Sequence, residues 1–345
     1  MKRVFAVTAA LALLGLGIAA HAAITIDTVA VGDPGNAGEL SGEGAGGSGP
    51  DRICGSVGYT YNIGKYEVTA AQYTDFLNKV ARTDAYGLYN TNMDTAIYDF
   101  GCNIKRTGSS GSYTYSVASD WANRPVNLVT YWDSCRFANW LHNGQPTGLQ
   151  TAATTERGVY TLDGYNGGDG RTIQRNANWK WAVTSEDEWH KAAYYKGSGT
   201  DAGYWLYPTS SDTAPGRDMA DASGNNANYY ADGYSIGSPY YRTEVGEFQN
   251  SDSPYGTFDQ GGNVWEWHEA IVYEGSDYAY RGLRGGSFVD NDYNLQASYR
   301  NYYFDSTCEY YMFGFRVSEV VPEPSSFIAL AAGLISLLGI RRRRA

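Results

Sequence analysis

One stretch of the chain has the residue types and spacing that suit a bound metal ion. Residues 259–266 place two carboxylates, Asp259 and Glu266, seven positions apart with a glycine-rich backbone between them. Calcium prefers several oxygen ligands, from carboxylates and backbone carbonyls, at about 2.3–2.6 Å. The stretch therefore predicts a calcium site. The alternative is a structural role, in which an arginine or backbone donors pair with Glu266.

A second polar segment, residues 287–300, carries groups that could act in catalysis. Ser287 is a potential nucleophile, but no base stands beside it in the sequence. Asp290 and Asp292 could serve in glycan hydrolysis, which uses two carboxylates, and Arg300 is a further polar candidate. Two aspartates in a polar loop are also common on solvated surfaces.

The cysteines and histidines form no familiar metal-binding pattern. No Cys-x-x-Cys pair occurs, which excludes zinc ribbons and thioredoxin-type redox sites. His142, His190 and His268 stand apart from one another, and we expect each to be structural or solvated. Two disulfides, in any of three pairings, could form among the four cysteines Cys54, Cys102, Cys135 and Cys308. The alternative is that these cysteines are buried free thiols.

The composition excludes several classes of protein. The chain has 345 residues and a formal net charge of −11, so it lacks the basic face that a non-specific nucleic-acid binder needs. Charged residues make up 18% and aromatic residues 15%, which argues against a disordered polymer. The 42 glycines show no three-residue period, which excludes collagen. No linker divides the central part, so we expect one large folded domain without a nucleic-acid partner.

Few segments have the periodicity of regular elements. Thr69 can cap one helix, residues 130–142 show helical spacing, and Ser185 with Glu188 forms a capping box for a third helix. Residues 24–31 and 57–65 predict strands. The long stretches between them are rich in Gly, Asn, Asp, Tyr and Ser. Because tyrosine can bury its ring and still bond a loop carbonyl, we predict a loop-rich domain with an aromatic core.

Both ends of the chain have the character of sorting segments. Residues 1–22 combine a basic start, an apolar run and an Ala-x-Ala site, which predicts a secretory signal peptide. At the other end, residues 321–345 hold Val-Pro-Glu-Pro, an apolar stretch over 327–340 and four arginines. That stretch is about long enough for a short transmembrane helix. Without these ends the chain loses six basic residues and one acidic residue, which gives a net charge of −16.

The C-terminal segment resembles the PEP-CTERM sorting signal of Gram-negative bacteria, in the order of its three features. The resemblance implies export, recognition by an exosortase, and a transient anchor in the inner membrane before the protein reaches the cell surface or extracellular matrix. It also implies a link to exopolysaccharide, which makes an extracellular polysaccharide a further expected partner.

Residues 57–318 resemble the formylglycine-generating-enzyme, or sulfatase-modifying-factor, domain. Six segments in order carry the resemblance: Gly64–Thr69, Arg124–Val129, Trp181–Trp189, Gly262–Trp267, Arg284–Phe288 and Gly314–Val317. The resemblance implies an α+β, C-type-lectin-like fold with little regular secondary structure. Residues 23–56 would then be a strand and a Gly/Ser-rich loop that lead into the domain.

The resemblance also implies particular calcium ligands. In the first site, Asp259 and Glu266 match ligand positions of the family, and Gly262 and Val264 match positions that act through carbonyl oxygens. A second family site begins at Asn228 and Tyr229, while the loop that should complete it, residues 237–240, lacks the expected aspartate.

The catalytic pair of the family is missing from this sequence. The formylglycine-generating enzyme binds copper(I) through two cysteines shortly after its Arg-Gly-Gly-Ser motif, and thiolates suit that soft ion. Here the segment after Ser287 has no cysteine, and Asp290 stands about where the first thiol would be. We therefore expect neither copper binding nor sulfatase-activating oxidase activity. A related branch binds iron through a His-x-x-x-His-x-Glu cluster, which is also absent.

Two functional hypotheses follow. The first is a calcium-stabilised, non-catalytic binding or matrix module linked to exopolysaccharide. The alternative is an oxidoreductase related to the formylglycine-generating enzyme, or another enzyme with altered chemistry in that family's active-site cleft, using Ser287, Asp290, Asp292 or Arg300. The two differ in whether these groups and Trp265 surround one open pocket.

Overall fold

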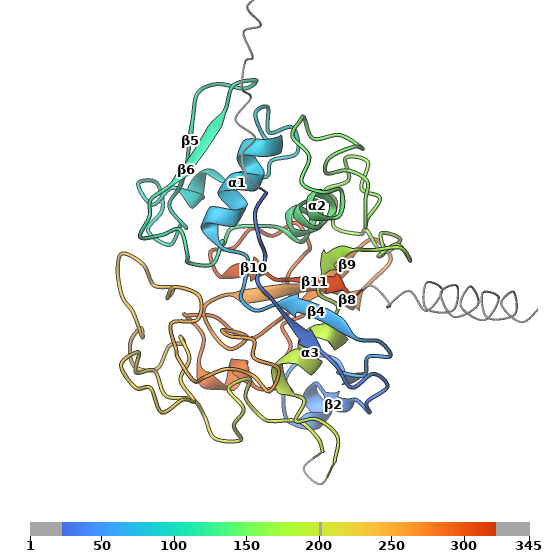
Figure 1. Cartoon of the computed structure of the whole chain (residues 1–345), viewed down its shortest axis with the longest axis vertical. Coiled ribbons are helices and arrows are strands. Elements are labelled where there is room, and N and C mark those ends of the chain that lie inside the picture. The colour runs from blue at the N-terminus through green and yellow to red at the C-terminus, as the bar shows by residue number, and fades with distance from the viewer. Residues whose placement is uncertain (1–22, 200–201, 322–345) are drawn as a thin grey trace, which may run out of the picture.

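The fold is α+β, with short elements joined by long loops, in the computed structural model of residues 23–199 and 202–321 (Figure 1). The helices are α1 (Ala70–Val80), α2 (Tyr131–His142) and α3 (Glu186–Tyr194), with 3-10 turns at Glu43–Ala45, Thr91–Met93 and Asp292–Leu295. The strands are β1 (Thr28–Val31), β2 (Glu39–Ser41), β3 (Arg52–Cys54), β4 (Tyr61–Gly64), β5 (Ile104–Thr107), β6 (Thr114–Val117), β7 (Trp181–Val183), β8 (Trp265–Glu274), β9 (Ala279–Arg284), β10 (Phe313–Phe315) and β11 (Val317–Val320).

Two sheets bring the two ends of the domain together. The larger sheet has the order β1-β4-β11-β7, so the last strand lies between the fourth and the seventh. The smaller sheet has the order β10-β8-β9, in which β10 and β8 are parallel and pair Phe313 with Trp265. Hairpins β2-β3 and β5-β6 complete the strands of the described residues. Figure 1 shows α1 and α2 on one side of the central strands and α3 on the other.

The three predicted helices are confirmed, as are the predicted starts at Thr69 and Ser185; the cap at Thr130 was not predicted. Each begins with a capping box in which a hydroxyl accepts from the third helical N–H: Thr69 from Gln72, Thr130 from Asp133, and Ser185 from Glu188. Helix α2 differs from a surface helix because all its residues from Tyr131 to Leu141 are buried. The polypeptide around it therefore covers its polar positions as well as its apolar ones.

The predicted aromatic core is confirmed. Its centre lies between α1, α2 and β10, where Phe137 packs its ring edge-to-face on Phe76 at 5.3 Å and on Phe315 at 5.3 Å. Several buried tyrosines also donate their hydroxyls to loop carbonyls, as expected. Tyr73 bonds the carbonyl of Leu88 at 2.8 Å, and Tyr115 bonds that of Ala81 at 2.8 Å. Rings thus supply the apolar area, and hydroxyls satisfy the irregular backbone.

Of the two alternatives for the cysteines, the structure has free thiols. Cys54, Cys102 and Cys135 are buried and Cys308 is half-buried, each without a disulfide. They are dispersed: Cys54 accepts hydrogen bonds from Arg284 and Arg300, whereas Cys135 lies on α2. Burial raises the pKa of all four thiols, which keeps them protonated and unreactive.

The predicted signal peptide, residues 1–22, and the predicted membrane span, residues 327–340, lie outside the described residues. Within residues 23–199 and 202–321, no helix is long and apolar enough to cross a bilayer.

Candidate functional site

Three carboxylates, those of Glu67, Asp259 and Glu266, lie near enough to one another for their charges to interact around Arg316. Long-range backbone contacts bring them together, since the N–H of Phe258 donates to the carbonyl of Lys65 at 2.9 Å. This bond sets Asp259 near Glu67, and strand β8 adds Glu266. Arg316 provides the positive charge among the three carboxylates and is fully buried.

The carboxylate of Glu266 already has its partners. Arg316 binds it through two nitrogens, Nε to Oε2 and Nη2 to Oε1, both at 2.6 Å. The indole N–H of Trp189 donates to Oε2 at 2.7 Å. All three side chains are buried. The structural alternative for Glu266, pairing with an arginine, is therefore present, and its negative charge is balanced without a metal ion.

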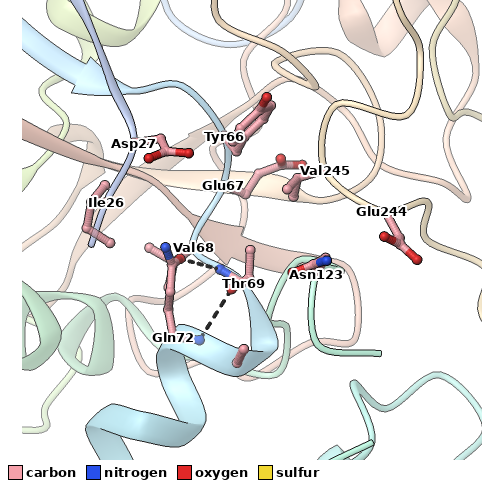
Figure 2. A pocket seen from close by; sticks show the side chains of 11 residues that line it. Ile26, Asp27, Tyr66, Glu67, Val68, Thr69, Gln72, Asn123, Glu244 and Val245 are labelled. Carbon is pink, nitrogen blue, oxygen red and sulfur yellow. Dashed lines mark hydrogen bonds between the residues drawn. The ribbon is translucent and has the colours of Figure 1, made fainter. Parts of the chain in front are cut away.

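Glu67 is a candidate that the sequence analysis missed. It is 2% exposed, and neither of its carboxylate oxygens has a hydrogen-bond partner among the described residues. Burial, and next the charge of Asp259, raise its pKa well above the usual range, while Arg316 lowers it. Glu67 lines a cleft of about 370 Å³ and lies beside Val245 in Figure 2. A buried carboxylate without a donor fits a bound cation.

Asp259 lies in a tight turn and lines a separate small cavity together with Phe258 and Gln260. Its φ is 60°, and its Oδ2 accepts from the N–H of Gly246 at 2.6 Å. Burial raises its pKa to about 6, against the lowering effects of the Gly246 bond and Arg316. Farther along the turn, Gly262 has a φ of 89°, and a Cβ there would lie 2.2 Å from the carbonyl oxygen of Asn228. Only glycine fits that position.

The second predicted site adjoins the first because the backbone of Asn228 pairs with that of Gly262. The N–H of Asn263 donates to the carbonyl of Asn228 at 2.9 Å. The side-chain nitrogen of Asn228 has two acceptors, but its Oδ1 is buried and has no partner among the described residues. The hydroxyl of Tyr229 is occupied by the carbonyl of Pro215 at 2.6 Å. Asn228 thus offers an amide oxygen for a ligand, whereas the side chain of Tyr229 offers none.

Neither predicted calcium site is built from side-chain ligands alone. In the part of the chain that the structure describes, no three His, Cys, Asp or Glu side chains are grouped as metal ligands are. Calcium does not require such a group, because it also takes carbonyl and amide oxygens.

The structure brings together some of the predicted cleft residues and separates the others. Asp290 accepts from the indole N–H of Trp265 at 2.8 Å and from the hydroxyl of Ser287. Burial raises the pKa of Asp290, and these two bonds lower it. Arg300 lies elsewhere, fully buried and paired with Glu186. Asp292 begins the 3-10 turn Asp292–Leu295.

A second acidic pair, Asp133 and Glu309, was also missed. Both line a cleft of about 540 Å³ at the start of α2. Burial and then the charge of Asp133 raise the pKa of Glu309 to about 7; Asp84 adds to this effect, and a hydrogen bond from Asn90 opposes it. Burial raises the pKa of Asp133 to about 6. No local pattern in the sequence pairs residues so far apart.

This pair predicts a pH dependence of stability. Because the folded pKa of Glu309 lies above its ordinary value of 4.5, the folded state holds more protons, and stability falls as pH rises from about 4 to about 7. Glu309→Gln should reduce that fall by on the order of 2 kcal/mol. Urea unfolding of both proteins at pH 4.5 and 7.5 measures the difference. Equal falls in the two proteins would contradict the prediction.

The comparisons with known proteins decide the family. The model of the sulfatase-modifying factor enzyme 1-like domain matches residues 55–320. The chain belongs to this family. The PEP-CTERM protein-sorting motif matches residues 320–344, which implies export, sorting in Gram-negative bacteria and recognition by an exosortase. A search of curated proteins gives no match.

This sulfatase-modifying-factor-like chain is also similar to several solved structures. CarF is 19% identical, with a TM-score of 0.52, and the alignment covers 86% of this chain and 99% of CarF. PvdO from Pseudomonas aeruginosa is 19% identical with a TM-score of 0.45, covering 85% and 94% of the two chains. Treponema denticola variable protein 1 is 18% identical with a TM-score of 0.44, covering 85% and 95%. The likeness to CarF supports the predicted fold class.

Proposed function

We propose that this sulfatase-modifying-factor-like chain is a calcium-stabilised, non-catalytic binding or matrix module associated with extracellular polysaccharide. The observation that carries the proposal is the state of Asp290. It stands about where the family has its first copper-binding cysteine, and Trp265 and Ser287 both donate to its carboxylate. A carboxylate held in this way supplies neither a thiolate for copper(I) nor a free base.

Calcium is supported by the carboxylate oxygens of Glu67 and the Oδ1 of Asn228, which lack partners among the described residues. The carboxylates of Glu67 and Asp259 and the carbonyls of Gly262 and Val264 would hold the ion in the first site, with Glu266 bound to Arg316 at its edge. In the second site, the Oδ1 of Asn228 and the backbone of Tyr229 would contribute. The ion would neutralise buried negative charge and tie together long irregular loops.

The sorting signal supports a location for this module. Recognition by an exosortase would follow a transient stay in the inner membrane through residues 327–340, and the mature domain would reach the cell surface or matrix. Exposed tyrosines give the domain rings that can stack on sugars, among them Tyr273 at 46% and Tyr303 at 66% exposure. These features make an extracellular polysaccharide the expected partner.

A test of the non-catalytic role is copper loading with an oxidase assay. The purified chain should bind no stoichiometric copper(I) and should consume no oxygen with a cysteine-containing sulfatase peptide. The reason is that the two cysteines that bind copper(I) in the formylglycine-generating enzyme are missing from the segment after Ser287. A formylglycine-generating enzyme serves as the positive control. One equivalent of copper with turnover would contradict the proposal. A glycan array on the same chain tests the binding role, and an array without any bound glycan would contradict that part.

A further inference from the structure

A cleft of about 400 Å³ lies beside strands β8 and β9 and carries positive charge in an acidic protein. Three arginines line it, Arg52, Arg175 and Arg281, with one carboxylate, Glu269. The whole chain has a net charge of −11. Arginines gathered in a concave site on such a chain indicate a negatively charged ligand.

The single carboxylate that lines this cleft is already used. Arg175 donates to Glu269 at 2.9 Å, and the hydroxyl of Tyr160 also donates to it. Arg175 binds Glu188 as well, at 2.7 and 2.9 Å. Arg175 and Glu269 are therefore committed to existing ion pairs, and the charge that remains for a ligand must come from the other two arginines.

Arg281 has no ion pair among the described residues, although it is only 4% exposed. Its guanidinium donates to backbone carbonyls, those of Glu269, of Gly170 at 3.0 Å and of Ile173 at 2.8 Å. The Nε of Arg281 has no hydrogen-bond partner within the described residues. The hydroxyl of Tyr131, which lines the same cleft and is fully buried, interacts with the thiol of Cys135 but has no oxygen or nitrogen partner there. Two buried donors without an oxygen acceptor, one of them cationic, fit an oxygen-bearing anion.

Arg52 adds charge at the exposed side of the cleft. Its side chain is 37% exposed, and its Nη1 donates to the carbonyl of Ile271 at 3.2 Å. Its Nε lies 3.5 Å from Glu186, but that carboxylate is also bound by Arg284 and Arg300. One glutamate cannot neutralise three arginines, so Arg52 keeps charge for a ligand.

We propose that this cleft binds the carboxylate of a uronic acid residue in an acidic polysaccharide. The guanidinium groups of Arg52 and Arg281 and the hydroxyl of Tyr131 would donate to the carboxylate oxygens. Ile173 and Ile271 supply apolar edges for the sugar ring. This inference rests on the proposed polysaccharide partner and specifies its charge.

The experiment is calorimetric titration of the full chain, in buffered calcium, with trigalacturonate and with cellotriose as the neutral probe. Trigalacturonate should bind at least about tenfold more tightly, and Arg52→Gln should weaken it by about tenfold. Tyr131→Phe should weaken it with little change in the melting temperature, because the hydroxyl it removes has only the Cys135 thiol, a weak acceptor, as a partner among the described residues. Arg157→Gln, which removes an exposed arginine elsewhere, is the control and should bind as the wild type does.

The outcomes separate this inference from the proposed function. Equal affinity for both probes, or trigalacturonate binding that Arg52→Gln and Tyr131→Phe leave unchanged, would overturn the uronate site while polysaccharide binding stands. A chain that binds no glycan of any charge would overturn both.

Discussion

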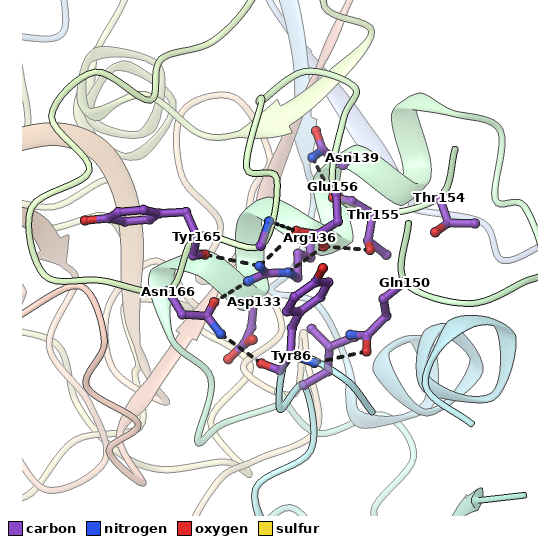
Figure 3. A network of polar contacts seen from close by, with 12 residues as sticks. Tyr86, Asp133, Arg136, Asn139, Gln150, Thr154, Thr155, Glu156, Tyr165 and Asn166 are labelled. Carbon is purple, nitrogen blue, oxygen red and sulfur yellow. Dashed lines mark hydrogen bonds and ion pairs between the residues drawn. The ribbon is translucent and has the colours of Figure 1, made fainter. Parts of the chain in front are cut away.

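Replacing Arg136 with methionine should lower the free energy of unfolding by about 3–5 kcal/mol. Arg136 is fully buried on α2 and binds Glu156 through Nε at 2.8 Å and Nη2 at 3.0 Å. It also donates to Asn166 at 2.6 Å and to the carbonyl of Tyr165 at 3.1 Å (Figure 3). The substitution would leave Glu156, itself 3% exposed, as a buried charge without its arginine.

Urea unfolding measures this effect, and the chain supplies its own control. Arg157 binds Asp163 through two nitrogens at 2.7 and 2.8 Å, but both side chains are largely exposed. Arg157→Gln should therefore cause no measurable loss. The double variant Arg136→Met with Glu156→Leu should recover much of the loss, because it removes both charges. Equal losses in the free energy of unfolding for Arg136→Met and Arg157→Gln would contradict the prediction that the buried ion pair matters more than the exposed one.

Removing calcium should lower the melting temperature by about 5–10 °C when the wild-type protein starts at a calcium concentration about 100-fold above its Kd. Glu67→Gln should respond less to calcium, so the order of thermal stability of the variant and the wild type should depend on whether calcium is present. Without calcium this variant should be at least as stable as the wild type, because it removes a buried carboxylate that has no partner among the described residues. With calcium it should be less stable than the wild type. Thermal unfolding in calcium and in EGTA measures both.

The matched control for this variant is Glu274→Gln, which removes an exposed carboxylate at the far end of β8. It should keep the full calcium response of the wild type. A Glu67→Gln variant that still gains the full stabilisation from calcium would contradict the role assigned to Glu67.

Local features of the fold could be predicted from the sequence. The capping boxes at Thr69, Thr130 and Ser185 depend on residues three positions apart, so a short window contains the whole signal. The double role of tyrosine, ring in the core and hydroxyl on a loop carbonyl, follows from its chemistry and was also predicted. The fold class came from six motifs spread over the domain.

Long-range features could not be predicted in this way. Glu67 lies in a family motif, but its surroundings depend on a loop near residue 259, almost two hundred positions away. Glu309 and Asp133 come from distant segments for the same reason. Arg300 was placed with Asp290 because they are close in sequence, whereas the chain between them turns Arg300 toward Glu186.

Equilibrium dialysis of the purified chain measures how many calcium ions it binds. At least one equivalent should bind to the wild type and to Glu274→Gln, and at least one fewer to Glu67→Gln. No bound calcium in the wild type, or the same number in Glu67→Gln, would contradict this prediction.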